Sequence, residues 1–185
     1  MKRPFVIAIL GAESTGKSQL AQALASHLEG SLEGSLKARV TWVPEWLRAW
    51  CDQQGRTPQP HEQEAIAREQ IRLIEAACAS HEVVVCDTTA VMTAVYSHLL
   101  FNDRTLDDLA VQAHRRVDLT LLTALDVPWQ ADSHQRDGPH VREPVDRAIR
   151  SLLSQNDMSW LTVTGLGPQR LAVAIQHVEA KLKQI

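Results

Sequence analysis

The sequence has few of the features that mark disulfide-rich or zinc-binding proteins. Its three cysteines, Cys51, Cys78 and Cys86, form no CxxC pair. An odd number of widely spaced cysteines does not suit a disulfide framework and indicates a reducing compartment. The eight histidines include no HExxH or other metal-ligand spacing, which argues against a structural zinc site.

Long hydrophobic runs and a strong charge of one sign are also missing. The apolar run at residues 5–10 is too short for a signal peptide or a membrane span. A formal net charge of -3 gives no overall attraction to nucleic acid or anionic membranes. We therefore expect a cytoplasmic protein without nucleic-acid or membrane partners. Its 185 residues suit a single domain over 1–185, and they do not indicate an oligomeric state.

What the chain does have is a regular alternation of two patterns. Short, β-branched, nearly uniformly apolar segments are separated by segments with apolar residues at helical spacing. Uniformly apolar strands are typical of parallel sheets that are buried on both faces. The expected strands are residues 5–10, 38–43, 82–86, 117–123 and 160–164. The alternation predicts right-handed crossovers and a three-layer α/β fold.

One glycine-containing motif follows the first expected strand. Residues 11–18, GAESTGKS, match GxxxxGK[ST] at every fixed position. The glycines allow the backbone N–H groups to point at a phosphate, and the helix that follows aims its positive end there. The motif predicts that Lys17 reaches the β- and γ-phosphates from a solvated site and that Ser18 ligates Mg²⁺. The expected ATP-binding residues are Gly11, Glu13, Ser14, Thr15, Gly16, Lys17, Ser18 and Gln19.

A phosphate loop alone does not separate kinases from GTPases or sensors. A GTPase needs Asn/Thr-Lys-x-Asp near the fourth strand, and residues 123–126 (TALD) lack the lysine. Asp87 ends the third strand, where it could hold Mg²⁺ or accept a proton, or instead cap the helix that starts near Ala90. Glu45 follows the second strand, where it could bind or deprotonate a substrate hydroxyl, or be a solvated acid at a helix start.

Residues 129–144 have no regular period, and such a long loop is often a lid. Arg136 and Arg142 in this loop could clamp the γ-phosphate, or each could be an ordinary surface arginine.

Three tryptophans, Trp42, Trp46 and Trp50, recur every four residues around Glu45. Packing explains all three, and we expect Trp50 in the core. A flat aromatic ring beside Glu45 could equally stack on a substrate ring, so the role of Trp46 stays open.

Four segments together resemble a known family. GAESTGKS, PEWLRAW, VVVCDTTAVMTAVYS and DLTLLTALDVPWQADSHQRDGPHVRE are similar to the ribosylnicotinamide kinase domain of NadR-type proteins. The resemblance implies a P-loop kinase fold with a parallel sheet of order 2-3-1-4-5. It also implies that ATP and Mg²⁺ are used to phosphorylate the 5′-hydroxyl of nicotinamide riboside, giving nicotinamide mononucleotide for NAD salvage.

The resemblance also assigns a substrate site. By position it implies substrate contacts from Glu45, Trp46, Arg48, Thr88, Thr89, Trp129 and Asp132. Tryptophans replace the usual tyrosines, and Thr89 replaces an aspartate, so a different nucleoside or metabolite is an alternative acceptor. A non-catalytic sensor is a third reading, against which the lid arginines argue. Because the adenylyltransferase and DNA-binding segments of multidomain members are missing, we expect the mononucleotide to be the final product.

Overall fold

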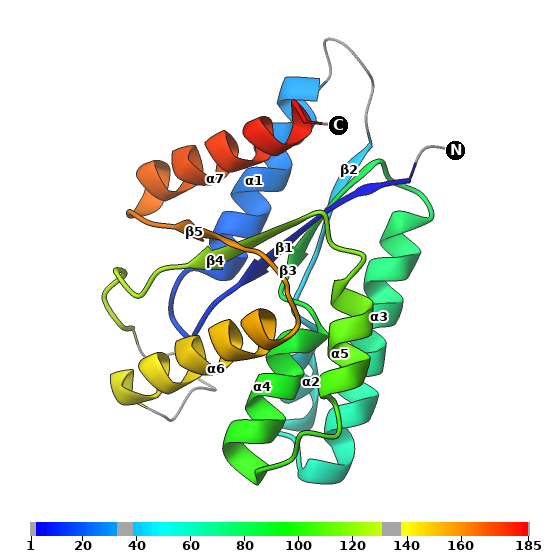
Figure 1. Ribbon diagram of the computed structural model, residues 1–185, viewed down its shortest axis with the longest axis vertical. Coiled ribbons are helices and arrows are strands. Elements are labelled where there is room, and N and C mark those ends of the chain that lie inside the picture. The colour runs from blue at the N-terminus through cyan, green and yellow to red at the C-terminus, as the bar shows by residue number, and fades with distance from the viewer. Residues whose placement is uncertain (1–2, 33–38, 131–137, 185) are drawn as a thin grey trace.

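The computed structural model describes residues 3–32, 39–130 and 138–184. Its centre is one parallel five-stranded sheet of order β2-β3-β1-β4-β5, which confirms the fold class and the strand order (Figure 1). The strands are β1 (Phe5–Leu10), β2 (Val40–Val43), β3 (Val83–Asp87), β4 (Leu119–Thr123) and β5 (Leu161–Val163). Each lies within two residues of the segment that the sequence predicts.

Helices cover both faces of the sheet and complete three layers. Helices α1 and α7 lie on one face, and α3, α4, α5 and α6 lie on the other (Figure 1). The helices are α1 (Lys17–Leu32), α2 (Trp46–Gln54), α3 (Gln63–Cys78), α4 (Ala90–Phe101), α5 (Asp107–His114), α6 (Arg142–Gln155) and α7 (Gly167–Leu182). Two 3₁₀ turns, η1 (Pro60–Glu62) and η2 (Pro139–Val141), precede α3 and α6. No helix in the described ranges is long and apolar enough to cross a membrane.

The core follows from the alternation of side chains along β1. Ile7 and Ile9 pack against α1 and α7, whereas Val6 and Leu10 face the helices on the opposite side. The three central strands are buried at every position. The edge strands β2 and β5 are largely half-buried or exposed, because each pairs with only one neighbour. The expectation of burial on both faces is therefore right only for the central strands.

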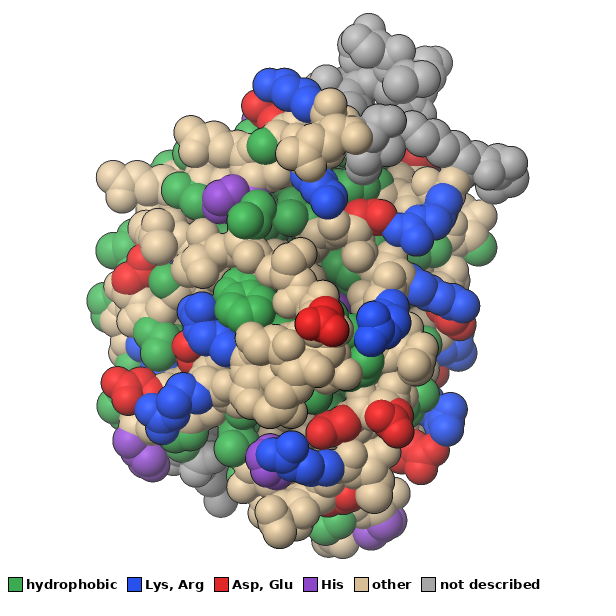
Figure 2. Space-filling model, viewed as in Figure 1, with side chains coloured by type: hydrophobic (Ala, Val, Ile, Leu, Met, Phe, Trp, Pro, Cys, Tyr) green, Lys and Arg blue, Asp and Glu red, His purple; other side chains and the backbone are tan. Residues whose placement is uncertain are grey.

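Charged side chains of both signs lie interspersed on the surface. On the face in Figure 2, acidic and basic groups alternate over α4, α5 and α6. Ion pairs between neighbouring helix residues account for part of this pattern, for example Arg150 with Asp146 at 2.7 Å. Exposed pairs of this kind contribute little to stability.

A buried histidine ties α5 to α4 and to the sheet. His114 is 3% exposed, and its Nδ1 lies 3.0 Å from Thr89 Oγ1. Its Nε2 lies 2.9 Å from Thr120 Oγ1 on β4. Burial lowers the pKa of His114 from 6.5 to about 4, because the charged ring would lose its hydration.

This buried histidine predicts a pH dependence of stability. As the pH falls below 6.5, the unfolded chain protonates His114 while the folded protein does not, until its own pKa near 4 is reached. The free energy of unfolding should therefore drop over this window, by up to about 3 kcal/mol from the histidine alone. Urea unfolding of the wild type and His114→Gln between about pH 7.5 and pH 4 measures the difference. Parallel curves for both proteins, with exposed His61→Gln as the control, would contradict the prediction.

Candidate active site

The phosphate loop connects β1 to α1 at the carboxyl end of the sheet. Gly11 has a φ of 154°, and a Cβ built on it would lie 1.9 Å from Thr123 Oγ1. Ser14 and Gly16 also have positive φ, of 55° and 77°. Glycine at position 11 is therefore required by both space and backbone angle, and the loop adopts the concave form that binds anions.

Thr123, at the end of β4, supports the phosphate loop through side-chain hydrogen bonds. Its Oγ1 lies 3.2 Å from the Leu10 carbonyl oxygen and 2.7 Å from Thr15 Oγ1. Thr15 Oγ1 in turn donates to the Ala12 carbonyl oxygen at 2.8 Å. Sequence reasoning missed Thr123, because only the parallel pairing of β4 with β1 brings it under the loop.

Lys17 folds back into the loop and does not extend into solvent. Its side chain is 9% exposed, and its Nζ donates to the Ala12 carbonyl oxygen at 2.9 Å. The expectation of a solvated lysine is wrong, because the ammonium group is buried and replaces water by a backbone oxygen of the loop. Its positive charge still acts on Glu45 and Asp87, where it opposes the rise in pKa that burial causes.

Asp87 lies at the end of β3, beside β1 and next to the loop. It is 2% exposed, and its Oδ1 has no hydrogen-bond partner among the described residues. Burial raises the pKa of Asp87, and a hydrogen bond from Ser18 and the charges of Lys17 and Arg48 oppose this. A buried carboxylate oxygen without a donor, next to a hydroxyl, fits Mg²⁺, which binds hard oxygen ligands. Ser18 and Asp87 are therefore suitable residues to hold that ion.

The alternative role of Asp87 as a helix cap is wrong. Thr89 occupies the N-cap position of α4, and its Oγ1 accepts a hydrogen bond from the Val91 N–H at 3.3 Å. Thr89 is 4% exposed and also contacts His114, so the fold itself accounts for the hydroxyl that we expected to meet substrate.

Thr88, between Asp87 and the cap, has an unusual backbone. It is a buried, β-branched residue with a φ of 71°, which costs conformational energy. Its N–H donates to the Ile9 carbonyl oxygen at 3.1 Å, and its Oγ1 donates to the Thr89 carbonyl oxygen at 3.0 Å. Such strain, held by surrounding bonds, is typical of functional sites, and Thr88 directly follows Asp87.

Glu45 stands at the N-cap position of α2 but makes no capping hydrogen bond. Its side chain is only 14% exposed, so it is not the solvated acid of the alternative interpretation. The pKa of Glu45 is raised, mainly by burial. The positive charges of Lys17 and Arg48 oppose this rise, whereas the carboxylates of Asp87 and Glu13 add to it. The charges of Lys17, Asp87, Arg48 and Glu13 therefore all lie close enough to Glu45 to affect its ionisation.

Tyr96 of α4 also belongs to this group, although the sequence analysis did not identify it. Burial raises its pKa well above the ordinary value, and the carboxylates of Glu13 and Glu45 raise it further. It is the only tyrosine in the chain. Most buried residues of α4 are apolar and belong to the core, so a single polar aromatic residue in this helix was the signal available in the sequence.

The tryptophans have different surroundings. Trp46 is half-buried at the start of α2, and its backbone N–H donates to Gln70 Oε1 at 2.7 Å. The expectation that Trp50 belongs to the core is wrong, because it is half-buried and lies under the Arg56 guanidinium, 5.0 Å from the ring centroid. Trp129 Nε1 is buried without a partner among the described residues.

The segment expected to be a lid is only partly described. Asp132 and Arg136 lie outside the described residues. Gln130, just before them, is joined to the loop, because its carbonyl oxygen accepts from Ser14 Oγ at 2.8 Å. We expected residues 139–144 to be irregular, but they form η2 and the start of α6.

Arg142, the first residue of α6, is not a surface arginine. It is 7% exposed, and its Nη1 donates to the Val127 carbonyl oxygen at 2.8 Å. Its Nε and Nη2 have no partner in the described part of the chain. A buried guanidinium with two unused donors is suited to an anionic ligand.

A second buried arginine, Arg170 of α7, was not predicted. It is 4% exposed and donates to the carbonyl oxygens of Thr15 in the loop and of Gly165 after β5. It also pairs with Asp126, whose Oδ2 accepts from the Gly165 N–H at 2.7 Å. These bonds hold the turns after β4 and β5 against the phosphate loop.

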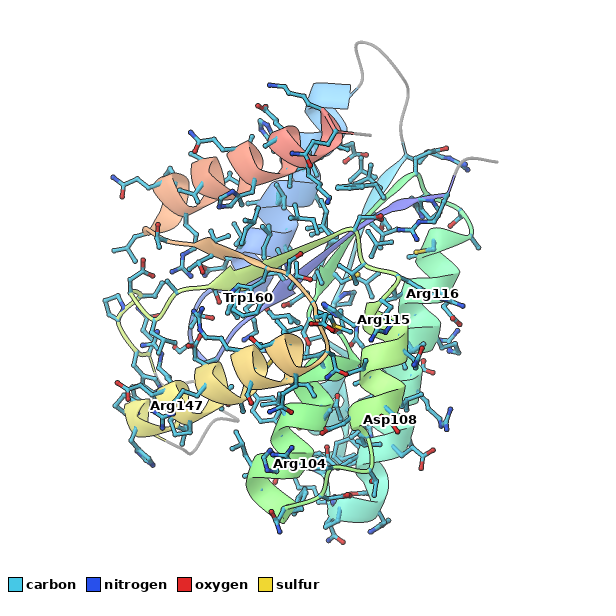
Figure 3. All side chains as sticks on the ribbon, viewed as in Figure 1. Arg104, Asp108, Arg115, Arg116, Arg147 and Trp160 are labelled. Carbon is cyan, nitrogen blue, oxygen red and sulfur yellow. The ribbon has the colours of Figure 1, made fainter. Side chains whose placement is uncertain are left out.

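A cavity of about 220 Å³ lies elsewhere, between α4, α5 and α6. Arg104 and Arg147, labelled in Figure 3, are among its lining residues. Neither the phosphate loop nor Glu45 or Asp87 contributes a residue to its lining. The cavity is therefore separate from the candidate active site.

The fold and its loop agree with comparisons to known proteins. The family model described as "AAA domain" matches residues 6–170. A NadR structure in complex with NAD and AMP-PNP superposes with a TM-score of 0.76 and 18% identity, over 97% of this chain and 50% of that one. NadR in complex with NR gives 0.75 and 20%, over 96% and 51%. Thymidylate kinase from Ehrlichia chaffeensis gives 0.63 and 16%, over the whole of both chains.

These likenesses establish the fold, since all three identities are low. The chain spans about half the length of the NadR chains that it matches. No curated protein sequence matches it significantly. The resemblance inferred from the four sequence segments is thus confirmed at the level of the fold. With the family model covering residues 6–170, the chain belongs to the AAA domain family and has a P-loop kinase fold.

Proposed function

We propose that this chain is an ATP-dependent kinase that transfers a phosphoryl group to the 5′-hydroxyl of nicotinamide riboside, giving nicotinamide mononucleotide for NAD salvage. The observation that carries the proposal is the meeting of a phosphate loop with buried carboxylates. Lys17 of the loop acts electrostatically on both Glu45 and Asp87. A phosphate donor and a hydroxyl acceptor could therefore be held side by side at the carboxyl edge of the sheet.

The donor side is suited to ATP. The backbone N–H groups of residues 11–18 would cradle the phosphates, and Lys17 would offset the charge that develops during transfer. Arg142 could add the two donors that have no other partner. Ser18 and Asp87 would hold Mg²⁺, which neutralises phosphate charge when bound. The complex of NadR with AMP-PNP, which has the same fold, supports this assignment.

The acceptor side is suited to a nucleoside without phosphate. Three carboxylates, Glu13, Glu45 and Asp87, would repel an acceptor that already carries an anionic group. Their charge favours a cationic pyridinium ring, on which the half-buried Trp46 could stack. Glu45 is the better base, because Asp87 is engaged with Ser18 and would hold Mg²⁺. The complex of NadR with NR supports this substrate class.

Screening acceptors with ATP and Mg²⁺ tests the proposal. ADP release should rise at least about tenfold when nicotinamide riboside is added. Without an acceptor, the γ-phosphate of ATP can only react with water, which is poorly positioned for attack. Adenosine and uridine should give smaller increases, and mass spectrometry should identify the mononucleotide. Equal rates with all acceptors and with none would reject the substrate. No ADP release under any condition would favour a non-catalytic sensor.

A further inference from the structure

One buried carboxylate of the phosphate loop, Glu13, has no specific hydrogen bond in the proposed reaction. Oε2 of Glu13 and Oδ1 of Asp87 both lack a hydrogen-bond partner among the residues described. The two side chains are 9% and 2% exposed, so bulk water does not readily compensate either oxygen. Buried carboxylate oxygens without donors are costly and are normally paired. The Mg²⁺ of the proposed reaction would supply a partner for Asp87, whereas Glu13 Oε2 would still have none among the described residues.

The neighbours of Glu13 show which part of the site it faces. Its backbone belongs to the phosphate loop, but its carboxylate lies beside the Tyr96 hydroxyl of α4 and within electrostatic reach of Glu45. Glu45 is the N-cap residue that precedes α2, on the side proposed for the acceptor. A carboxylate turned toward the triphosphate would be repelled, so its position beside Tyr96 and Glu45 is the consistent one.

Carboxylates can only accept hydrogen bonds, so the missing partner must be a donor. The hydroxyl that becomes phosphorylated belongs next to Glu45. A second hydroxyl on the same acceptor could reach Glu13, with the Tyr96 hydroxyl as a neighbouring polar contact that orients the carboxylate. A ribose carries such hydroxyls, whereas a deoxyribose lacks one of them.

We propose that Glu13, oriented by Tyr96, accepts a hydrogen bond from a ribose hydroxyl of the acceptor and so selects ribonucleosides over their deoxy analogues. The inference rests on the proposed function, whose acceptor site it completes. Glu13 is thereby a substrate-binding residue and not only part of the phosphate loop. Tyr96 is a positioning residue that acts through Glu13.

The expected effect is a preference for the hydroxylated acceptor. A hydrogen bond to a buried charge is lost when the analogue lacks the donor, and the carboxylate then stays unpaired. The wild-type kcat/KM for nicotinamide riboside should exceed that for its 2′-deoxy or its 3′-deoxy analogue by about tenfold to hundredfold. Glu13→Gln and Tyr96→Phe should each reduce this ratio toward one.

Calorimetry with AMP-PNP present measures the same ratio without turnover, as the ratio of dissociation constants for each acceptor pair. Ser97→Ala is the matched control, because it removes from the next position of α4 a buried hydroxyl for which the described residues supply no partner. Its ratio should equal that of the wild type.

An unchanged ratio in both Glu13→Gln and Tyr96→Phe would overturn the inference, even if overall activity fell. A ratio that changes only in Glu13→Gln would support the contact of Glu13 and overturn the role of Tyr96. If nicotinamide riboside is not turned over but adenosine is, the proposed substrate fails. The pair of adenosine with its 2′-deoxy and 3′-deoxy analogues then tests Glu13 independently.

Discussion

Lys17→Ala should lower kcat by at least about two to three orders of magnitude, because the transferring phosphoryl group loses its main positive partner. The folded state should tolerate the change. The Ala12 carbonyl oxygen, which accepts from Lys17 Nζ, also accepts from Thr15 Oγ1 at 2.8 Å and so stays paired. Steady-state ADP release with nicotinamide riboside gives kcat, and thermal unfolding gives Tm.

Exposed Lys183→Ala is the control for loss of one positive charge. It should keep the wild-type kcat. Near-normal turnover in Lys17→Ala would remove the phosphate loop from the reaction. A large fall in Tm would instead show that the buried lysine supports the loop as well as the chemistry.

Asp87→Asn should reduce kcat by about two orders of magnitude or more while ATP binding changes little. The amide keeps the shape of the side chain and removes its charge, on which Mg²⁺ binding would depend. Thr89, and not Asp87, caps α4. The ability of asparagine to cap a helix therefore cannot compensate for the carboxylate that Asp87→Asn removes. Calorimetric titration with ATP and measurement of kcat separate binding from turnover.

The same substitution has an expected effect on stability with a definite sign. Burial raises the pKa of Asp87 in the folded protein, so its ionisation destabilises the fold at neutral pH. Asp87→Asn should therefore be at least as stable as the wild type near pH 7. This advantage in stability should shrink as the pH falls toward 3.8, the ordinary pKa of the carboxyl.

Full activity in Asp87→Asn, with exposed Asp108→Asn as the control, would move the catalytic role to Glu45 alone.

The sequence by itself determined the sheet and the phosphate loop. Five apolar segments predicted the strands within two residues, and for the three central strands burial on both faces leaves little choice of residue. The loop was recognisable because Gly11, Gly16, Lys17 and Ser18 are each required by backbone angle or by chemistry. These are local requirements, and local sequence records them.

The tertiary structure alone decided what surrounds the loop. Thr123, Tyr96 and Arg170 are far from residues 11–18 in sequence and come to the site through pairing of β1 with β4 and packing of α4 and α7. It also buried Thr89 against His114, which lies 25 residues further along the chain. Whether a polar residue faces a cavity, a core or solvent depends on partners distant in the chain. That environment, which sets burial and pKa, is a property of the packed fold and not of any local pattern.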